Sequence, residues 1–229
     1  DFRLKSENTT RQILHKHCCV QLQSRRLIMI EGLNYRVDFL TIEEEASLVR
    51  CIDAELWCSD LRRRVQHYGF RYDYKVRRLD HDGFLGALPL WALSLAQRLA
   101  TDRHMPSVPD QMIVNEYEPG QGIAPHIDRT DSFGPVVCSV SLLSACVMDM
   151  KHAVGPEAVP VNLQRRSLLV LVERHGMTGA TESRLDARIV LLVNRDPVAA
   201  GFPDVSKRPP CDPRAFLVVM LRERRSVGG

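Results

Sequence analysis

The segment His126-Ile127-Asp128 has the residue types and spacing most suited to chemistry. It follows a turn rich in glycine and proline, and the chain resumes as an extended segment after Pro125. Residues two apart in an extended segment point to the same side, so the imidazole and the carboxylate face one space. These groups can supply two of three facial ligands to iron(II), leaving positions open for a co-substrate and dioxygen. His175, which follows a later predicted strand, can complete the ligand set.

Basic residues are candidates for binding anions. Arg222 lies at the end of the last predicted strand, where a guanidinium can hold a dicarboxylate through paired hydrogen bonds. Other basic residues cluster at 62–64 and 75–78, and they form either a solvated surface or a phosphate-binding face. The net charge of +3 says little by itself about partners.

Length and composition indicate one main domain. The chain has 229 residues, 45% of them hydrophobic, which suits one well-buried domain or a domain with a modest appendage. Residues 1–24 are polar without a clear period, so we expect a mobile arm or a loosely docked helix before a domain over 25–229. We expect no membrane span and see no targeting signal. Seven cysteines, mostly isolated, favour reduced thiols in an intracellular protein of the cytoplasm or nucleus.

Apolar spacing predicts helices in the first half and short strands in the second. Thr41 and Glu44 can form a capping box, so a helix should begin there and continue to about Trp57. Pro89 should open a second helix that ends near Thr101. We expect strands over 27–30, 112–117, 136–143, 145–150, 159–163, 167–172, 189–193 and 216–221, with a strand and a long loop over 65–88. The pattern predicts an α+β fold whose strands form a sandwich or barrel.

Longer motifs support a resemblance to a known family. The pattern Asn115-x-Tyr117-x-Pro119-Gly120, followed by His126-x-Asp128, resembles the AlkB family of iron(II)/2-oxoglutarate dioxygenases. Further stretches resemble the branch of that family that acts on transfer RNA and hydroxylates a carboxymethyl-type modification of the wobble uridine. These stretches are 67–74, 83–89, 109–123, 147–152 and 165–170.

The resemblance implies a double-stranded β-helix, or jelly roll, with the N-terminal helices packed on one sheet. It assigns His126 and Asp128 to iron(II), and Asn115 and Tyr117 to the distal carboxylate of 2-oxoglutarate, with dioxygen as the third reactant. An amide and a phenol are neutral donors that suit an anionic acceptor. Two readings of the third ligand stay open: His175 with a shortened connection, or a lost ligand.

The family also places two arginines six residues apart on its last strand, one for each carboxylate of 2-oxoglutarate. Arg222 fits the second position, and the first holds Phe216. The other anchor is therefore absent or supplied from elsewhere in the chain.

We predict hydroxylation of a modified wobble uridine in tRNA. The alternatives are an oxidative demethylase of nucleic acid or protein, and a degenerate fold that only binds RNA. A tRNA methyltransferase is the expected protein partner. A flipped base would stack on the tyrosines, unless these are core residues, and the basic residues would hold phosphates. The predicted substrate residues are Tyr68, Tyr72, Tyr74, Arg62, Arg63, Arg64, Lys75 and Arg77.

Overall fold

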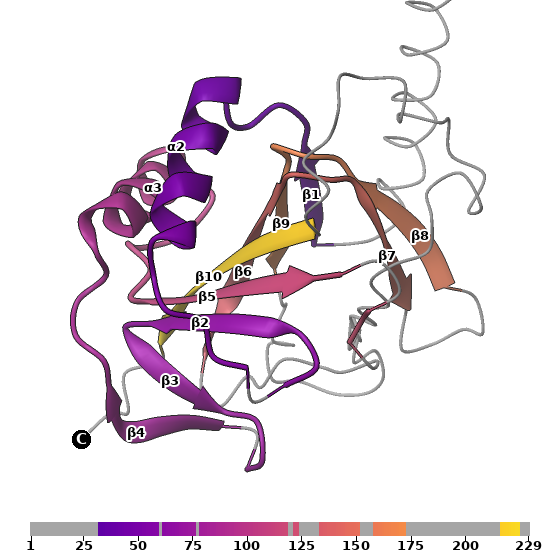
Figure 1. The fold of residues 1–229 in the computed structure, drawn as a ribbon. Helices are drawn as coiled ribbons and strands as arrows, with labels where there is room; N and C mark the ends of the chain where they lie inside the picture. The colour runs from indigo at the N-terminus through magenta and orange to yellow at the C-terminus, as the bar shows by residue number, and fades with distance from the viewer. Residues whose placement is uncertain are drawn as a thin grey trace, which may run out of the picture.

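The computed structural model describes residues 32–59, 61–76, 78–118, 121–123, 133–151, 158–172 and 216–224 (Figure 1). The expected arm over 1–24 and the expected strands over 27–30 and 189–193 lie outside the described residues. Helices α2 (Ile42–Asp53) and α3 (Leu90–Thr101) are the two helices of the described part. Neither is long and apolar enough to cross a membrane.

Local sequence explains where both helices begin. The Thr41 side chain accepts a hydrogen bond from the backbone N–H of Glu44, and the Glu44 carboxylate accepts one from the backbone N–H of Thr41. This is the predicted capping box. Pro89 is the N-cap of α3, also as predicted. Helix α2 ends at Asp53, earlier than expected, and Leu56, the last apolar position of the period, is 93% exposed.

One antiparallel sheet of six strands forms the centre of the structure. Its spatial order is β1-β9-β6-β10-β5-β2, and β3-β4 and β7-β8 form two smaller sheets. The large sheet contains β1 (Leu33–Arg36), β2 (Arg64–Tyr68), β5 (Gln111–Tyr117), β6 (Phe133–Leu142), β9 (Leu168–Val172) and β10 (Phe216–Arg224). The smaller sheets contain β3 (Phe70–Asp73), β4 (Arg78–Phe84), β7 (Cys146–Lys151) and β8 (Ala158–Leu163).

The large sheet is covered on both faces. Its helix-facing side contributes Met112, Val114 and other apolar residues to a core with α2 and α3. Its opposite side, here called the inner face, contributes Tyr117 and Val218 to a second core with β7 and β8. Figure 1 shows the two helices on one side of the sheet and β7 and β8 on the other. This is the predicted α+β arrangement, with helices packed on one sheet of a sandwich.

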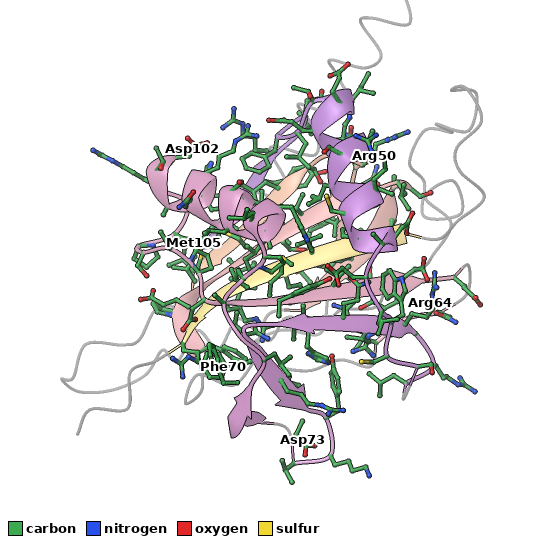
Figure 2. The ribbon with its side chains drawn as sticks, turned by 60° about the vertical axis from the view of Figure 1, so that its left-hand side comes forward. Arg50, Arg64, Phe70, Asp73, Asp102 and Met105 are labelled. Atoms are coloured by element: carbon green, nitrogen blue, oxygen red, sulfur yellow. The ribbon has the colours of Figure 1, made fainter. Side chains whose placement is uncertain are left out.

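The region expected to hold a strand and a long loop contains three strands instead: β2, β3 and β4. Gly69 separates β2 from β3 with a φ of +77°, and a β-carbon there would overlap the carbonyl oxygen of Asp110. Only glycine allows this close approach. The contact holds the β3–β4 hairpin beside the start of β5, and Figure 2 shows Phe70 near its base and Asp73 at its far end.

Candidate functional site

The three residues predicted to bind the co-substrate share the buried inner face of the large sheet. Asn115 and Tyr117 are two apart on β5, and the register of β10 pairs Val218 with Asn115 and Arg222 with Gln111. Alternate residues of paired strands point the same way, so all three side chains face β7 and β8. Asn115, Tyr117 and Arg222 are 2%, 3% and 4% exposed. The fold therefore brings them together inside the sandwich.

The inner face also carries polar residues that were not among the predicted site residues. Gln111, Ser139 and Ser141 are buried there, and their side-chain polar atoms have no hydrogen-bond partner among the described residues. Native proteins satisfy nearly all buried polar groups, and an unsatisfied one costs free energy. A polar ligand bound on this face would supply the partners. The available signal was the alternation of Ser139 and Ser141 with apolar residues along one predicted strand.

Arg63 reaches the inner face from the residue before β2. Its Nε donates a hydrogen bond to Oδ1 of Asn115 at 2.8 Å. Its guanidinium carbon lies 5.9 Å from the ring centre of Tyr117 and 5.3 Å from that of Tyr74. Arg63 is one of the residues predicted to contact substrate phosphates. In the structure it adjoins the residues expected to hold 2-oxoglutarate.

The β3–β4 hairpin adds an aromatic cluster beside Arg222. The rings of Tyr72 and Tyr74 are T-shaped to each other at 5.1 Å, and Tyr72 stacks on Phe133 at 6.2 Å. The Arg222 guanidinium lies 4.5 Å from the centre of the Phe133 ring. Two of the three predicted stacking tyrosines therefore adjoin the predicted cofactor-binding arginine.

A cavity of about 340 Å³ lies between β2 and the hairpin, and its lining includes His67, Arg71, Tyr72, Tyr74 and Lys75. Burial, with the nearby charges of Arg71 and Arg63, lowers the pKa of His67 to about 4. The imidazole is therefore neutral at physiological pH, and its Nδ1 has no hydrogen-bond partner among the described residues. The cavity thus offers aromatic faces and a neutral hydrogen-bonding group.

The prediction for Tyr68 needs correction, because this side chain lies on the opposite side of the sheet. The register pairs Tyr68 with Met112, and its ring packs against Trp91 of α3 at 5.2 Å. Its hydroxyl donates to Oε1 of Gln66 at 2.9 Å. Tyr68 is thus a core residue beneath the helices and does not reach the cavity face.

Arg64 has a partner that was not predicted from the sequence. It forms an ion pair with Glu116, a contact that raises the pKa of Arg64. The bond uses only the Nε–H, and the Arg64 side chain is 48% exposed, so contact with a substrate phosphate stays a prediction for Arg64. Arg62 and Lys75 are exposed, as residues that bind phosphate must be. Arg77 lies outside the described residues.

The predicted metal ligands His126, Asp128 and His175 lie outside the described residues, and no group of three metal-ligating side chains occurs within the described part. The described residues that flank the first two are informative. Ile123 packs on the inner core, and Phe133 contacts Arg222. The described residues before and after the His126–Asp128 segment thus both lie next to the inner face. The iron site itself stays a prediction.

Comparisons with known proteins agree with this geometry. The sequence profile of the 2OG-Fe(II) oxygenase superfamily matches residues 37–176, more than half of the chain. The chain is 38% identical over 164 residues to the tRNA (carboxymethyluridine(34)-5-O)-methyltransferase ALKBH8 of Macaca fascicularis, covering 64% of this chain and 24% of that protein. It is 31% identical over 205 residues to the alpha-ketoglutarate-dependent dioxygenase alkB homolog 4 of Mus musculus, covering 72% of this chain and 67% of that protein.

The chain thus spans about a quarter of the length of the macaque relative. Among solved structures, the fold is similar to that of OsALKBH1, with a TM-score of 0.58 and 14% sequence identity. That match covers 84% of this chain and 96% of the other. The predicted fold class and the predicted family resemblance are both confirmed.

Proposed function

Because the chain belongs to the 2OG-Fe(II) oxygenase superfamily, we propose that it hydroxylates a modified wobble uridine in tRNA, using iron(II), 2-oxoglutarate and dioxygen. The observation that carries this proposal is the polar inner face. Asn115, Tyr117 and Arg222 are buried on this face. Beside them are buried serine and glutamine side chains that have no hydrogen-bond partner among the described residues. A buried face of this composition suits a small polar ligand better than it suits an apolar core.

The residues present fit an acidic co-substrate. Arg222 offers a planar guanidinium that can bind a carboxylate through two parallel hydrogen bonds. Asn115 and Tyr117 add an amide donor and a hydroxyl donor. They lie four and six residues along β5 from Gln111, the residue that pairs with Arg222. In this proposal His126, Asp128 and His175 hold the iron.

When bound, the iron, 2-oxoglutarate and dioxygen supply an oxidant for an unactivated C–H bond, with release of succinate and carbon dioxide. The chain's own residues orient and shield the reactants. The ring of Phe133, on which Tyr72 stacks, lies against Arg222, and the side chain of Arg222 is buried from water, which strengthens its attraction for a carboxylate.

The aromatic cavity is the proposed entry for the substrate base. An enzyme that acts on a base takes it out of its stack, and aromatic faces replace the lost stacking. Tyr72 and Tyr74 can serve this purpose, while the exposed Arg62 and Lys75 can contact phosphates. Neutral His67 can hydrogen-bond the edge of the base without adding charge.

The name of the macaque relative supports the choice of wobble uridine in tRNA. A tRNA methyltransferase remains the proposed partner, because hydroxylation would act on a nucleoside that such an enzyme also modifies. We also propose an intracellular location. The four described cysteines, Cys51, Cys58, Cys138 and Cys146, are free thiols, which agrees with it.

Mass spectrometry of a defined RNA tests the proposal. The full chain would be incubated with iron(II), 2-oxoglutarate and an anticodon stem-loop carrying a 5-carboxymethyl-type wobble uridine. We expect a nucleoside heavier by one oxygen atom, formed together with succinate, and no product from Asp128→Ala. Release of formaldehyde from methylated nucleic acid or protein would instead support a demethylase. Salt-sensitive RNA binding without succinate would support a degenerate RNA-binding fold.

A further inference from the structure

We infer that Arg63 binds the distal carboxylate of 2-oxoglutarate, together with Asn115 and Tyr117. The inference rests on the proposed function and adds a residue to its site. It is carried by the contacts of Arg63 with those two side chains on the inner face.

The sheet register brings Arg63 to this place. Arg64 pairs with Glu116, so one further step along the antiparallel ladder sets Arg63 beside Tyr117. Odd-numbered residues of β5 point to the inner face, and Arg63 reaches that face in the structure. The side chain thus approaches the expected carboxylate-binding pair from the β2 side.

On the other side of Tyr117, the position of β10 that pairs with it holds no cation. β10 pairs Phe216 with Tyr117, so position 216 is the other direct neighbour of Tyr117 in the sheet. An arginine at position 63 or at position 216 would bring a positive charge to the same end of the inner face. Phenylalanine carries no charge, and Arg63 is the cation that the described structure places there.

The donor geometry of Arg63 suits a carboxylate. A guanidinium has five N–H donors in a planar fork. The Nε–H donates to Asn115, which fixes the plane of the group and orients the amide. The described partners of Arg63 are this amide and the rings of Tyr117 and Tyr74, none of which is an anion. A carboxylate bound beside Asn115 and Tyr117 would compensate its charge.

Arg63 and Arg222 lie at opposite ends of the same space. Arg63 adjoins Asn115 and Tyr117, while Arg222 pairs with Gln111 at the start of β5. Tyr74 is influenced by both: burial raises the pKa of its hydroxyl, and the charges of the two arginines act in the opposite direction. The same buried face thus carries two cations, and 2-oxoglutarate has two carboxylates.

Titration calorimetry with two ligands tests the role of Arg63. The full chain would be loaded with zinc in place of iron to prevent turnover, and titrated with 2-oxoglutarate and with 2-oxopentanoate, which lacks the distal carboxylate. Arg63→Gln should raise the Kd for 2-oxoglutarate by about 10- to 100-fold and leave that for 2-oxopentanoate unchanged. Arg63→Lys should restore part of the affinity. Arg50→Gln, an exposed charge loss on α2, should change neither.

Three results would overturn the inference while leaving the proposed function intact. One is an unchanged Kd for 2-oxoglutarate in Arg63→Gln. Another is an equal loss of affinity for both ligands, which would mean that Arg63 only supports the local structure. The third is a loss confined to RNA affinity, which would place Arg63 on the substrate surface. Thermal unfolding verifies that each variant folds. If Arg63→Gln does not fold, the Kd values of Arg63→Lys for the two ligands are compared with those of wild type instead. A wild-type chain that binds no 2-oxoglutarate would contradict both proposals.

Discussion

The carboxylate of Glu45 on α2 forms an ion pair with Arg165, with 2.6 Å between Oε2 and the terminal guanidinium nitrogen. Glu45 is 2% exposed and also accepts a hydrogen bond from the backbone N–H of Leu143 at 2.8 Å. Leu143 has a φ of 67°, a conformation that a leucine rarely adopts. A single helical carboxylate thus joins α2 to the turn before β7 and to the turn before β9.

Replacing Glu45 should therefore destabilise the fold strongly. Glu45→Gln removes the charge opposite the partly exposed Arg165 and weakens the support for the Leu143 turn, so we expect a loss of about 2 kcal/mol in the free energy of unfolding. Urea unfolding monitored by circular dichroism measures it. The exposed Glu55→Gln is the matched control, and its midpoint should stay close to wild type. Equal midpoints for the two variants would refute the structural role of Glu45.

Buried His67 should make stability fall in mildly acidic solution. Its pKa is lowered from 6.5 to about 4 in the folded state, so between these values the unfolded chain binds the proton that folded His67 refuses. Stability should thus decrease as pH falls from about 6.5 to about 4, with no contribution from this group above that window. In His67→Asn this component should vanish. Parallel pH profiles of the urea midpoint for the two proteins would contradict the shift.

Arg222 should control affinity for 2-oxoglutarate from the other end of the inner face. Its side chain is buried against Phe133, so Arg222→Gln should raise the Kd for 2-oxoglutarate by at least about tenfold. The control is Arg224→Gln, two residues further along the same strand. Arg224 is exposed and forms an ion pair with Asp110, so this substitution should leave the Kd for 2-oxoglutarate unchanged. Similar affinities for both variants in zinc-loaded protein would argue against Arg222 as an anchor.

The two sides of the sheet should differ in RNA binding. Tyr72 faces the cavity, so Tyr72→Leu should weaken binding of the modified stem-loop by about 1–3 kcal/mol, the value of one stacked base. Tyr68→Phe removes a hydrogen bond to Gln66 beneath the helices and should lower stability by about 1 kcal/mol without changing RNA affinity. Fluorescence anisotropy with a labelled stem-loop measures both. A larger affinity loss in Tyr68→Phe would reverse this assignment.

Local signals in the sequence were enough to predict the helices and most strands. The Thr41 capping box and Pro89 mark the helix starts, and the apolar runs from Gln111 onward mark the strands, because both signals depend on neighbouring residues alone. The family resemblance predicted roles for Asn115, Tyr117 and Arg222, and strand alternation explains why the three side chains share a face.

Long-range pairing explains what the sequence did not reveal. In one continuous strand the even-numbered Tyr68, Tyr72 and Tyr74 would share a face, but the left-handed Gly69 interrupts the alternation between Tyr68 and the other two. The proximity of Arg63 to Asn115 depends on the register between β2 and β5, across 52 residues of sequence. No local pattern encodes that register, so the neighbours of Arg63 and the pairing of Arg64 with Glu116 became visible only in the structure.

Conversion of 2-oxoglutarate to succinate, measured by mass spectrometry with and without iron(II), tests the central claim most directly. The wild-type chain should form succinate only when iron(II) is present, and Asp128→Ala should form none while unfolding at a similar temperature. Succinate formation by the folded Asp128→Ala protein at the wild-type rate would contradict the assignment of Asp128 to the metal, and the absence of iron-dependent succinate from wild type would contradict the oxygenase itself.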